Sequence, residues 1–224
     1  MGKVNVIAID GPAGSGKSTV AKRLAKRLGF LYIDTGAMYR ALTLKAINEG
    51  VDFMDEKALI ELSRKTDIEL KDEGGSLRVY LDKKEVSEPI RTMQVTGKVK
   101  YVASIGGVRE NMVKLQRSLG ACSSGAVLEG RDIGTVVFPD ALHKFYLDAS
   151  FKTRAKRRFD ELKEKGFSIT LEEVEKDVRD RDASDKKRSI GPLKKAEDAR
   201  VIDTTDMTVD EVVEYILKKI NEKK

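Results

Sequence analysis

The sequence predicts an α/β fold around a parallel sheet, and two patterns carry this prediction. Residues 4–9 form an apolar, largely β-branched run, as expected for a strand that is buried on both faces. A glycine-rich turn and a helical pattern over residues 19–28 follow this run. A second apolar run at 31–33 and a helical pattern at 38–47 then repeat the order of strand and helix. This alternation is typical of a parallel sheet with crossover helices.

The middle of the chain shows a different pattern. Residues 68–71 and 77–81 alternate apolar with polar side chains on either side of the turn-forming segment 72–75. Such alternation predicts a β-hairpin with one solvated face, which belongs to a small antiparallel insertion and not to the parallel sheet. Two helices are expected after the hairpin, over residues 92–104 and 108–119.

The second half of the sequence returns to the α/β pattern. Three further apolar runs are expected to be strands of the parallel sheet, at 126–128, 145–147 and 201–202. Residues 151–185 are highly charged and helical, and a capping box begins at Thr170. A second capping box, from Thr208 to Glu211, precedes a final amphipathic helix.

A phosphate-binding loop lies between the first strand and the first helix. Residues 11–18 read Gly-Pro-Ala-Gly-Ser-Gly-Lys-Ser and match the pattern G-x-x-x-x-G-K-[ST]. Its glycines let backbone amides turn toward a polyphosphate, and the following helix N-terminus adds partial positive charge. Lys17 is expected to bridge the β- and γ-phosphates, and the Ser18 hydroxyl to bind Mg²⁺. The predicted ATP-binding residues are Gly11, Pro12, Ala13, Gly14, Ser15, Gly16, Lys17, Ser18 and Thr19.

The loop does not by itself identify the reaction. The Asn-Lys-x-Asp motif with which GTPases read guanine is absent from the sequence. A chain of 224 residues with this loop and two inserted segments looks like a small-molecule kinase with a P-loop NTPase-type sheet.

Two further motifs narrow the prediction. Residues 34–40, Asp-Thr-Gly-Ala-Met-Tyr-Arg, follow the second strand, and residues 130–141 begin with Gly-Arg-Asp-Ile-Gly-Thr. Together with residues 166–168 and 181–188, these segments closely resemble bacterial cytidylate kinases, and the similarity spans essentially the whole chain. The resemblance implies transfer of the γ-phosphoryl group of ATP to CMP or dCMP, with Mg²⁺ as the cofactor. Another small P-loop kinase, acting on UMP or on a broader range of acceptors, is the alternative.

The resemblance also implies how the chain is organised. It would be a single P-loop kinase domain, residues 1–224. An antiparallel insertion, roughly 60–100, would bind the nucleoside monophosphate, and a helical lid would span roughly 150–190. Both segments are expected to close over the substrates, because water must be excluded if ATP is not to be hydrolysed.

The acceptor site follows from the same resemblance. Thr35, Arg40, Arg131 and Arg188 would hold the acceptor's phosphate; Arg181 and Asp185 would contact the ribose hydroxyls; Arg109 and Asp132 would read the cytosine edge. Lys17, Arg131, Arg188 and Arg157 are the predicted catalytic residues, which act by positioning and by neutralising charge.

For four residues the sequence leaves two roles open. Tyr39 either forms a wall of the acceptor pocket or is ordinary core. Arg157 either reaches the transferring phosphate from the lid or belongs to a solvated charged face. Asp34 either meets Mg²⁺ through water or caps the next helix. Lys100 stands where many relatives carry a serine that helps to read the base; if its ammonium points at the base, it favours the carbonyl of uracil.

Composition sets further limits on function. The net charge is +6, which suits phosphorylated small molecules, but acidic residues are interleaved with the basic ones, which argues against a nucleic-acid-binding protein. One cysteine and one histidine exclude an intrachain disulfide and a conventional zinc site. No targeting or membrane-spanning segment is visible, so we expect a cytoplasmic protein without nucleic-acid or membrane partners. No long apolar pattern that would force a dimer is visible either, so we expect a monomer.

Overall fold

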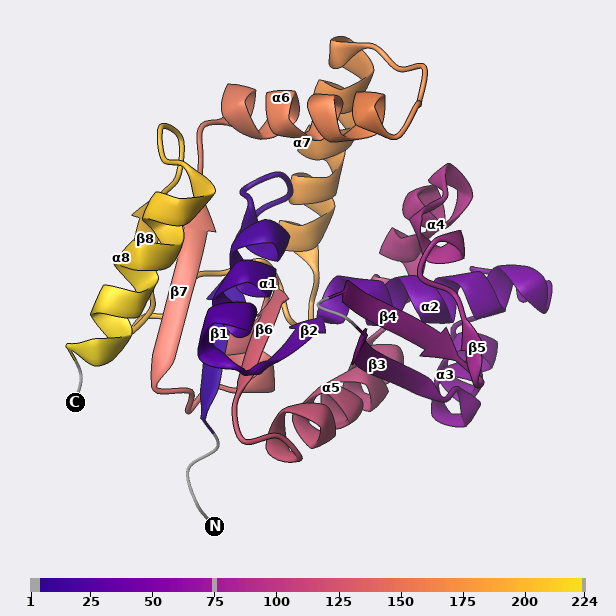
Figure 1. The fold of residues 1–224 in the computed structure, drawn as a ribbon. Coiled ribbons are helices and arrows are strands. Elements are labelled where there is room, and N and C mark those ends of the chain that lie inside the picture. The colour runs from indigo at the N-terminus through magenta and orange to yellow at the C-terminus, as the bar shows by residue number, and fades with distance from the viewer. Residues whose placement is uncertain (1–4, 74–75, 223–224) are drawn as a thin grey trace.

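A computed structural model of the chain describes residues 5–73 and 76–222, and a five-stranded parallel sheet lies at its centre (Figure 1). The strands lie in the order β2 (Leu31–Asp34), β6 (Ala126–Gly130), β1 (Val6–Asp10), β7 (His143–Asp148) and β8 (Arg200–Asp203). Every neighbouring pair in this sheet is parallel. The predicted α/β core is therefore confirmed. Its central strand comes from the first apolar run, of which residue 4 lies outside the described part of the chain.

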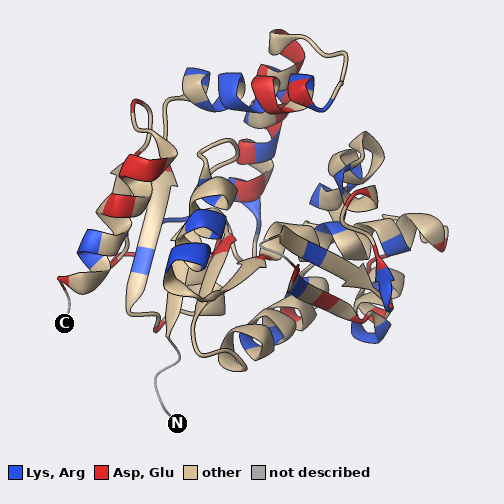
Figure 2. Cartoon of the chain, viewed as in Figure 1, with Lys and Arg blue, Asp and Glu red and all other residues tan. Residues whose placement is uncertain are grey.

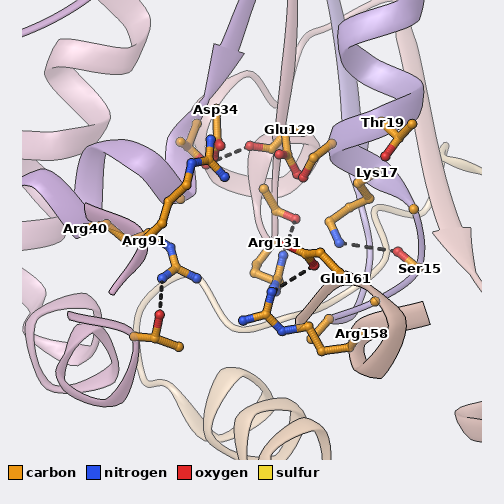
Figure 3. Close-up of a pocket in the computed structure, with 18 of the residues that line it drawn as sticks. Ser15, Lys17, Thr19, Asp34, Arg40, Arg91, Glu129, Arg131, Arg158 and Glu161 are labelled. Carbon is orange, nitrogen blue, oxygen red and sulfur yellow. Dashed lines mark hydrogen bonds and ion pairs between the residues drawn. The ribbon is translucent and has the colours of Figure 1, made fainter. Parts of the chain in front are cut away.

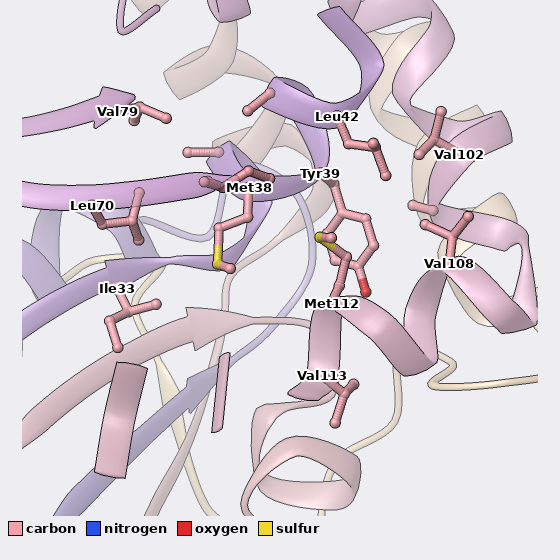
Figure 4. Close-up of a cluster of buried hydrophobic side chains, with 14 of the residues drawn as sticks. Ile33, Met38, Tyr39, Leu42, Leu70, Val79, Val102, Val108, Met112 and Val113 are labelled. Atoms are coloured by element: carbon pink, nitrogen blue, oxygen red, sulfur yellow. The ribbon is translucent and has the colours of Figure 1, made fainter. Parts of the chain in front are cut away.

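Alternate residues of β1 enter two hydrophobic cores, one on each face of the sheet. Among the helices that contribute to these cores are α1 (Lys17–Leu28), α8 (Val209–Asn221), α2 (Thr35–Asn48) and α5 (Gly106–Ala121). Ile7 and Ile9 pack with α1 and α8. Val6 and Ala8 belong to the second core with α2 and α5, part of which Figure 4 shows. A strand covered on both faces needs a continuous apolar run, which explains the pattern at residues 4–9.

The predicted hairpin forms a separate antiparallel sheet beside α2. The insertion consists of α3 (Glu56–Lys65), β3 (Ile68–Glu73), β4 (Ser76–Leu81), β5 (Lys84–Glu85), the 3₁₀-helix η1 (Pro89–Arg91) and α4 (Met93–Ser104). Leu70 and Val79 enter the same core as α2 (Figure 4), so the insertion is anchored by apolar contacts. Residues 74–75 of the expected turn lie outside the described residues. The sequence patterns did not predict α3 or β5.

The charged segment after β7 forms two helices above the carboxyl ends of the strands (Figure 1). These are α6 (Phe151–Glu164) and α7 (Leu171–Lys187). The capping box at Thr170 begins α7, as predicted, and Gly166 between the helices has φ +80°. In Figure 2, acidic and basic residues are interleaved along α7, whereas the first half of α6 is basic and its acidic residues follow in the second half. The cluster that they share has three buried apolar residues, Leu162, Val174 and Val178, against which Phe151, Phe159, Phe167 and Ile169 pack partly buried. It is a much smaller core than those on the two faces of the sheet.

No helix within residues 5–73 and 76–222 combines the length and the apolar character needed to cross a membrane.

Candidate active site

The phosphate-binding loop lies between the end of β1 and the start of α1, as its motif required. Gly11, Gly14 and Gly16 have φ angles of +151°, +75° and +86°, which L side chains rarely adopt. A Cβ at Gly11 would lie 2.0 Å from the carbonyl oxygen of Leu147 on β7. Glycine is therefore required where the loop passes the neighbouring strand, and the loop delivers Lys17 as the first residue of α1.

A large cleft of about 1830 Å³ opens beside this loop (Figure 3). The predicted site residues that line it are Ala13, Gly14, Ser15, Gly16, Lys17, Ser18, Thr19, Asp34, Thr35, Tyr39, Arg40, Arg109, Arg131, Asp132, Arg157, Arg181, Asp185 and Arg188. Of the predicted residues, only Gly11 and Pro12 are not among those that line the cleft. The structure thus brings together motifs that lie far apart in the sequence, because the carboxyl ends of parallel strands meet at one edge of the sheet.

Lys17 is buried at the bottom of the loop. Its Nζ donates to the carbonyl oxygen of Pro12 at 2.6 Å and to the Ser15 hydroxyl at 3.3 Å. Burial, followed by the positive charge of Arg131, lowers its pKa to about 7. The ammonium is thus held by loop oxygens in a site where a phosphate would stabilise its charged form.

Glu129 is a site residue that the sequence motifs did not identify. It lies on β6 in register with Ile9 and Asp34, and it is 5% exposed. Its carboxylate accepts a hydrogen bond from the hydroxyl of Tyr32 at 3.1 Å, and the Ser18 hydroxyl lies near enough to act on its pKa. Burial and the nearby charge of Asp34 raise its pKa. An acid directly after an apolar strand, next to the loop strand, was the signal that would have revealed it.

Asp34 and Thr35 connect β2 to α2. The Asp34 carboxylate accepts the backbone N–H of Ala37 at 2.9 Å, so the helix-capping interpretation of Asp34 is correct. Its side chain also lines the cleft, and its link to Mg²⁺ stays a prediction. The Thr35 hydroxyl donates to the carbonyl oxygen of Glu129 at 2.7 Å, which ties the start of α2 to β6.

Asp185 on α7 binds two of the arginines that the resemblance assigns to the acceptor. Its Oδ2 accepts from Nε of Arg131 at 2.7 Å, and its Oδ1 accepts from Nη2 of Arg188. Burial opposes ionisation of Asp185, but the charges of Arg131, Arg188 and Arg181 hold its pKa below the ordinary value. Within the described residues, the buried Nε of Arg188 has no hydrogen-bond partner. One carboxylate thus serves several guanidinium groups, and donors remain for an anionic ligand.

The arginines carry more positive charge than the acids around them neutralise. Burial and then the charges of Arg131 and Arg40 lower the pKa of Arg181 to about 9. Burial also lowers the pKa of Arg40. The charge of Asp34 raises this pKa, but the charges of Arg158, Arg91 and Arg131 oppose Asp34. Nη1 of Arg40 donates to the Thr96 hydroxyl of α4 at 2.8 Å, which brings the insertion into the site (Figure 3). Mutual repulsion among buried cations marks a site prepared for phosphate.

The predicted base-reading pair is buried beside Tyr39. Nη2 of Arg109 donates to Oδ2 of Asp132, and Nη1 donates to the carbonyl oxygen of Ala103 at 3.2 Å. The Arg109 guanidinium lies 5.5 Å from the centre of the Tyr39 ring. Tyr39 belongs to the hydrophobic core, as one interpretation held, and it also lines the cleft; its role as a wall of the acceptor pocket stays a prediction. Burial raises its pKa to about 12, so it is neutral and can present a hydroxyl.

Asp10 fixes the segment that carries Asp132. Both oxygens of its carboxylate accept backbone N–H groups, one from Ile133 and one from Gly134, each at 2.8 Å. These amides begin the short π-helix η2 (Ile133–Val137), which the sequence patterns did not predict. Burial raises the pKa of Asp10 to about 6. Asp10 thereby fixes the end of β1 relative to the segment that follows the Gly-Arg-Asp motif.

Two neighbouring arginines of α6 have different partners. Arg157 donates to the hydroxyl of Thr204 at 3.0 Å and to its carbonyl oxygen at 2.5 Å. Arg158 is paired with Glu161 at 2.8 Å, and its charge acts on Arg40 and Arg181 (Figure 3). The role of Arg157 at the transferring phosphate stays a prediction, and Arg158 is a second candidate that the sequence did not single out.

Lys100 is exposed on α4 and lines the cleft. Its ammonium lies 5.1 Å from the centre of the neighbouring Tyr101 ring. Lys98 on the same helix instead lies over Phe53, at 4.6 Å, and is not among the residues that line the cleft. Lys100 therefore lines the same cleft as Arg109 and Asp132, the predicted base-reading residues, so its effect on base preference can be tested.

The parallel sheet, the loop at the end of β1 and the arginine-lined cleft beside it define a P-loop kinase. The sequence profile of the Cytidylate kinase family matches residues 7–222, and a cytidylate kinase from Caldanaerobacter subterraneus subsp. tengcongensis is 53% identical over 214 residues, covering 96% of this chain and 93% of that protein. This chain belongs to the cytidylate kinase family, whose members are nucleoside monophosphate kinases.

Other similarities agree with this assignment. A cytidylate kinase from Clostridioides difficile is 50% identical over 216 residues, which cover 96% of this chain and 98% of that protein. In fold, the chain is similar to a gluconokinase from Sinorhizobium meliloti 1021, with a TM-score of 0.51 and 13% identity over 98% of this chain and 93% of the other. At that identity, the likeness concerns the fold alone. The predicted P-loop fold and family are both confirmed.

Proposed function

We propose that this chain transfers the γ-phosphoryl group of ATP to CMP or dCMP, giving ADP and CDP or dCDP. The observation that carries the proposal is a single cleft lined by the phosphate-binding loop, the acceptor arginines and the buried Arg109–Asp132 pair. Cytosine presents an amine donor and carbonyl and ring-nitrogen acceptors, and a guanidinium beside a carboxylate matches both kinds of group. The names of the relatives support cytidylate as the acceptor.

The chain's own residues supply positioning and charge. The attacking oxygen belongs to an anionic phosphate, so the reaction needs no strong general base. Lys17 would leave the loop oxygens for the β- and γ-phosphates of ATP, and Arg131 and Arg188 would turn from Asp185 toward the acceptor phosphate and the transferring group. Arg181 and Asp185 would hold the ribose, and Thr35 and Arg40 the acceptor phosphate.

The residues beside the loop fit a magnesium ion. Hydroxyl and carboxylate oxygens are the ligands that Mg²⁺ prefers. Ser18 would bind the ion directly, and Glu129 and Asp34 would hold its waters. Glu129 is buried with a raised pKa, an environment that a cation would compensate. When bound, Mg²⁺ would neutralise phosphate charge.

The wider interpretation rests on the same site. We infer a single kinase domain in which the insertion, roughly 60–100, and the lid, roughly 150–190, close over the substrates. An exposed, unpaired Cys122 suits a reducing compartment, so we infer a cytoplasmic protein, and we take it to act as a monomer. UMP, or a broader acceptor range, is the second candidate because Lys100 lines the cleft.

Comparison of acceptors tests the proposal. ADP formation from Mg²⁺–ATP is measured with CMP, dCMP, UMP, AMP and shikimate at equal concentrations. We expect kcat/KM for CMP and dCMP to exceed that for AMP by at least a hundredfold. Equal values for CMP and UMP would favour the broader acceptor range. No stimulation by any nucleoside monophosphate would contradict the proposed acceptor.

A further inference from the structure

The phosphate-binding loop is held from outside by two residues of the lid helices. The backbone N–H of Ala13 donates to Oδ1 of Asp182 on α7 at 3.1 Å. The carbonyl oxygen of Ala13 accepts from Nη1 of Arg154 on α6 at 2.9 Å. Arg154 also donates to Oδ2 of Asp182 at 2.6 Å, which closes a ring of three contacts. Both polar groups of one loop residue are thus fixed by a single ion pair.

This ion pair is removed from solvent. Arg154 and Asp182 are each 8% exposed, and Nε of Arg154 donates to the carbonyl oxygen of Ala149 at 3.2 Å. The backbone of α6 also touches the loop, because a Cβ at Gly14 would lie 2.5 Å from the carbonyl oxygen of Arg154. A buried pair costs desolvation free energy and tolerates little displacement, so the loop follows any movement of these helices.

The same face of α7 reaches the acceptor arginines. Asp185 lies three residues beyond Asp182, one helical turn away, and is 2% exposed. It accepts from Arg131 at 2.7 Å and from Arg188. One turn of α7 therefore connects the loop that would bind ATP with the arginines that would bind the acceptor.

We propose that Arg154 and Asp182 are positioning residues that couple the binding of the two nucleotides. This inference rests on the proposed function. An acceptor phosphate competes with Asp185 for Arg131 and Arg188, and the resulting adjustment of α7 is passed through Asp182 to Ala13. In the reverse direction, ATP binding to the loop acts through Ala13 and Asp182 on the same turn of α7. Coupling of this kind is reciprocal, so each nucleotide changes the affinity for the other by the same factor.

Calorimetric titration of the whole protein tests the coupling. CMP is titrated with and without a saturating, non-hydrolysable ATP analogue and Mg²⁺, and the analogue is titrated with and without CMP. In the unaltered protein we expect each ligand to tighten the other by about tenfold. Asp182→Asn leaves Arg154 with Asp148, whose Oδ1 is 4.0 Å from its Nε, as the remaining counter-ion, and is expected to reduce that factor to below about twofold. Asp160→Asn is the matched control, because Asp160 pairs with Lys156 on the exposed side of α6.

A second variant guards against loss of folding. Arg154→Lys keeps the buried charge but cannot reach Ala13, Ala149 and Asp182 together, so we expect an intermediate factor and a melting transition close to that of the unaltered protein. Unchanged coupling in a folded Asp182→Asn or Arg154→Lys protein would overturn the inference, as would weaker ATP binding with unchanged coupling. If UMP but not CMP binds the unaltered protein, the proposed acceptor fails while the coupling is measured with UMP.

Discussion

Arg109 and Asp132 form an ion pair that is almost completely withdrawn from water, with side chains 2% and 8% exposed. Arg109 comes from α5 and Asp132 follows β6, and Gly191 in the segment after α7 packs on both. A Cβ at Gly191 would lie 2.2 Å from Oδ2 of Asp132 and 2.3 Å from Nη2 of Arg109, and its φ is +60°. The pair is therefore enclosed by three segments of the chain, which fixes the geometry that the base would meet.

Asp132→Asn should affect stability and CMP binding together. The change leaves the buried Arg109 guanidinium without its counter-charge, which costs about 3 kcal/mol of unfolding free energy. We expect KM for CMP to rise at least tenfold, by analogy with other lost charge-assisted contacts, while KM for ATP stays within about twofold. Urea unfolding and steady-state kinetics measure these effects. Glu110→Gln, an exposed change on α5, is the control, and a folded Asp132→Asn protein with unaltered KM for CMP would contradict the assignment.

ATP binding should take up a proton above neutral pH. The pKa of Lys17 is lowered to about 7, so at pH 8 most of this side chain is neutral in the free protein. The phosphates of ATP favour the ammonium and raise the pKa again, so that binding at pH 8 protonates Lys17. Calorimetry in buffers of different ionisation enthalpy measures the uptake, which should approach one proton at pH 8 and decline as the pH falls through 7. Lys17→Arg stays charged throughout, and equal uptake by this variant would contradict the assignment.

Glu129→Gln should weaken the response to magnesium. The amide keeps the shape of the side chain but loses the charge that would hold the waters of the ion. We expect the Mg²⁺ concentration for half-maximal rate to rise about tenfold or more, as for other residues behind metal ligands. Tyr32→Phe is the matched control, because it removes the 3.1 Å hydrogen bond to Glu129 and leaves the carboxylate in place. An equal shift in both variants would indicate a purely structural role.

The parts of the structure that the sequence predicted correctly are those set by local patterns. The loop of residues 11–18 needs glycines at fixed spacing, and the hairpin strands alternate with a period of two, so each pattern is readable without knowing its neighbours. The family resemblance then located Arg109, Asp132 and Asp185, which the structure brings into one cleft.

The parts that escaped prediction depend on contacts between distant segments. Arg154 and Asp182 contact Ala13 across 141 and 169 residues, and by spacing alone both belong to charged helix faces that look solvated. In the sequence, Glu129 is only the residue that follows an apolar run. The pairing of β6 with β1 brings it close to Ser18. The role of Asp10 is likewise visible only in the structure, where its carboxylate accepts the first amides of the π-helix η2. Sequence spacing carries no information on these tertiary contacts.

Lys100→Ser should sharpen the preference for CMP. A serine hydroxyl can accept a hydrogen bond from the amine of cytosine, whereas the ammonium offers donors only. We expect the ratio of kcat/KM for CMP to that for UMP to rise by about tenfold, the value of one hydrogen bond to a base. Lys98→Ser is the control, because Lys98 lies over Phe53 on the same helix. An unchanged ratio in Lys100→Ser would show that Arg109 and Asp132 discriminate alone.

Replacing Arg157 and Arg158 separately by methionine should affect KM for ATP and kcat differently. Arg157 holds Thr204, whose hydroxyl lies 3.3 Å from the carbonyl oxygen of Ser15 and 3.0 Å from that of Asp148, so Arg157→Met should raise KM for ATP several-fold. Arg158 acts electrostatically on Arg40 and Arg181, so Arg158→Met should lower kcat by about tenfold or more, with a smaller effect on KM for ATP. Steady-state kinetics separates the two effects. A loss of kcat confined to Arg157→Met would instead assign the transferring phosphate to Arg157, as the sequence predicted.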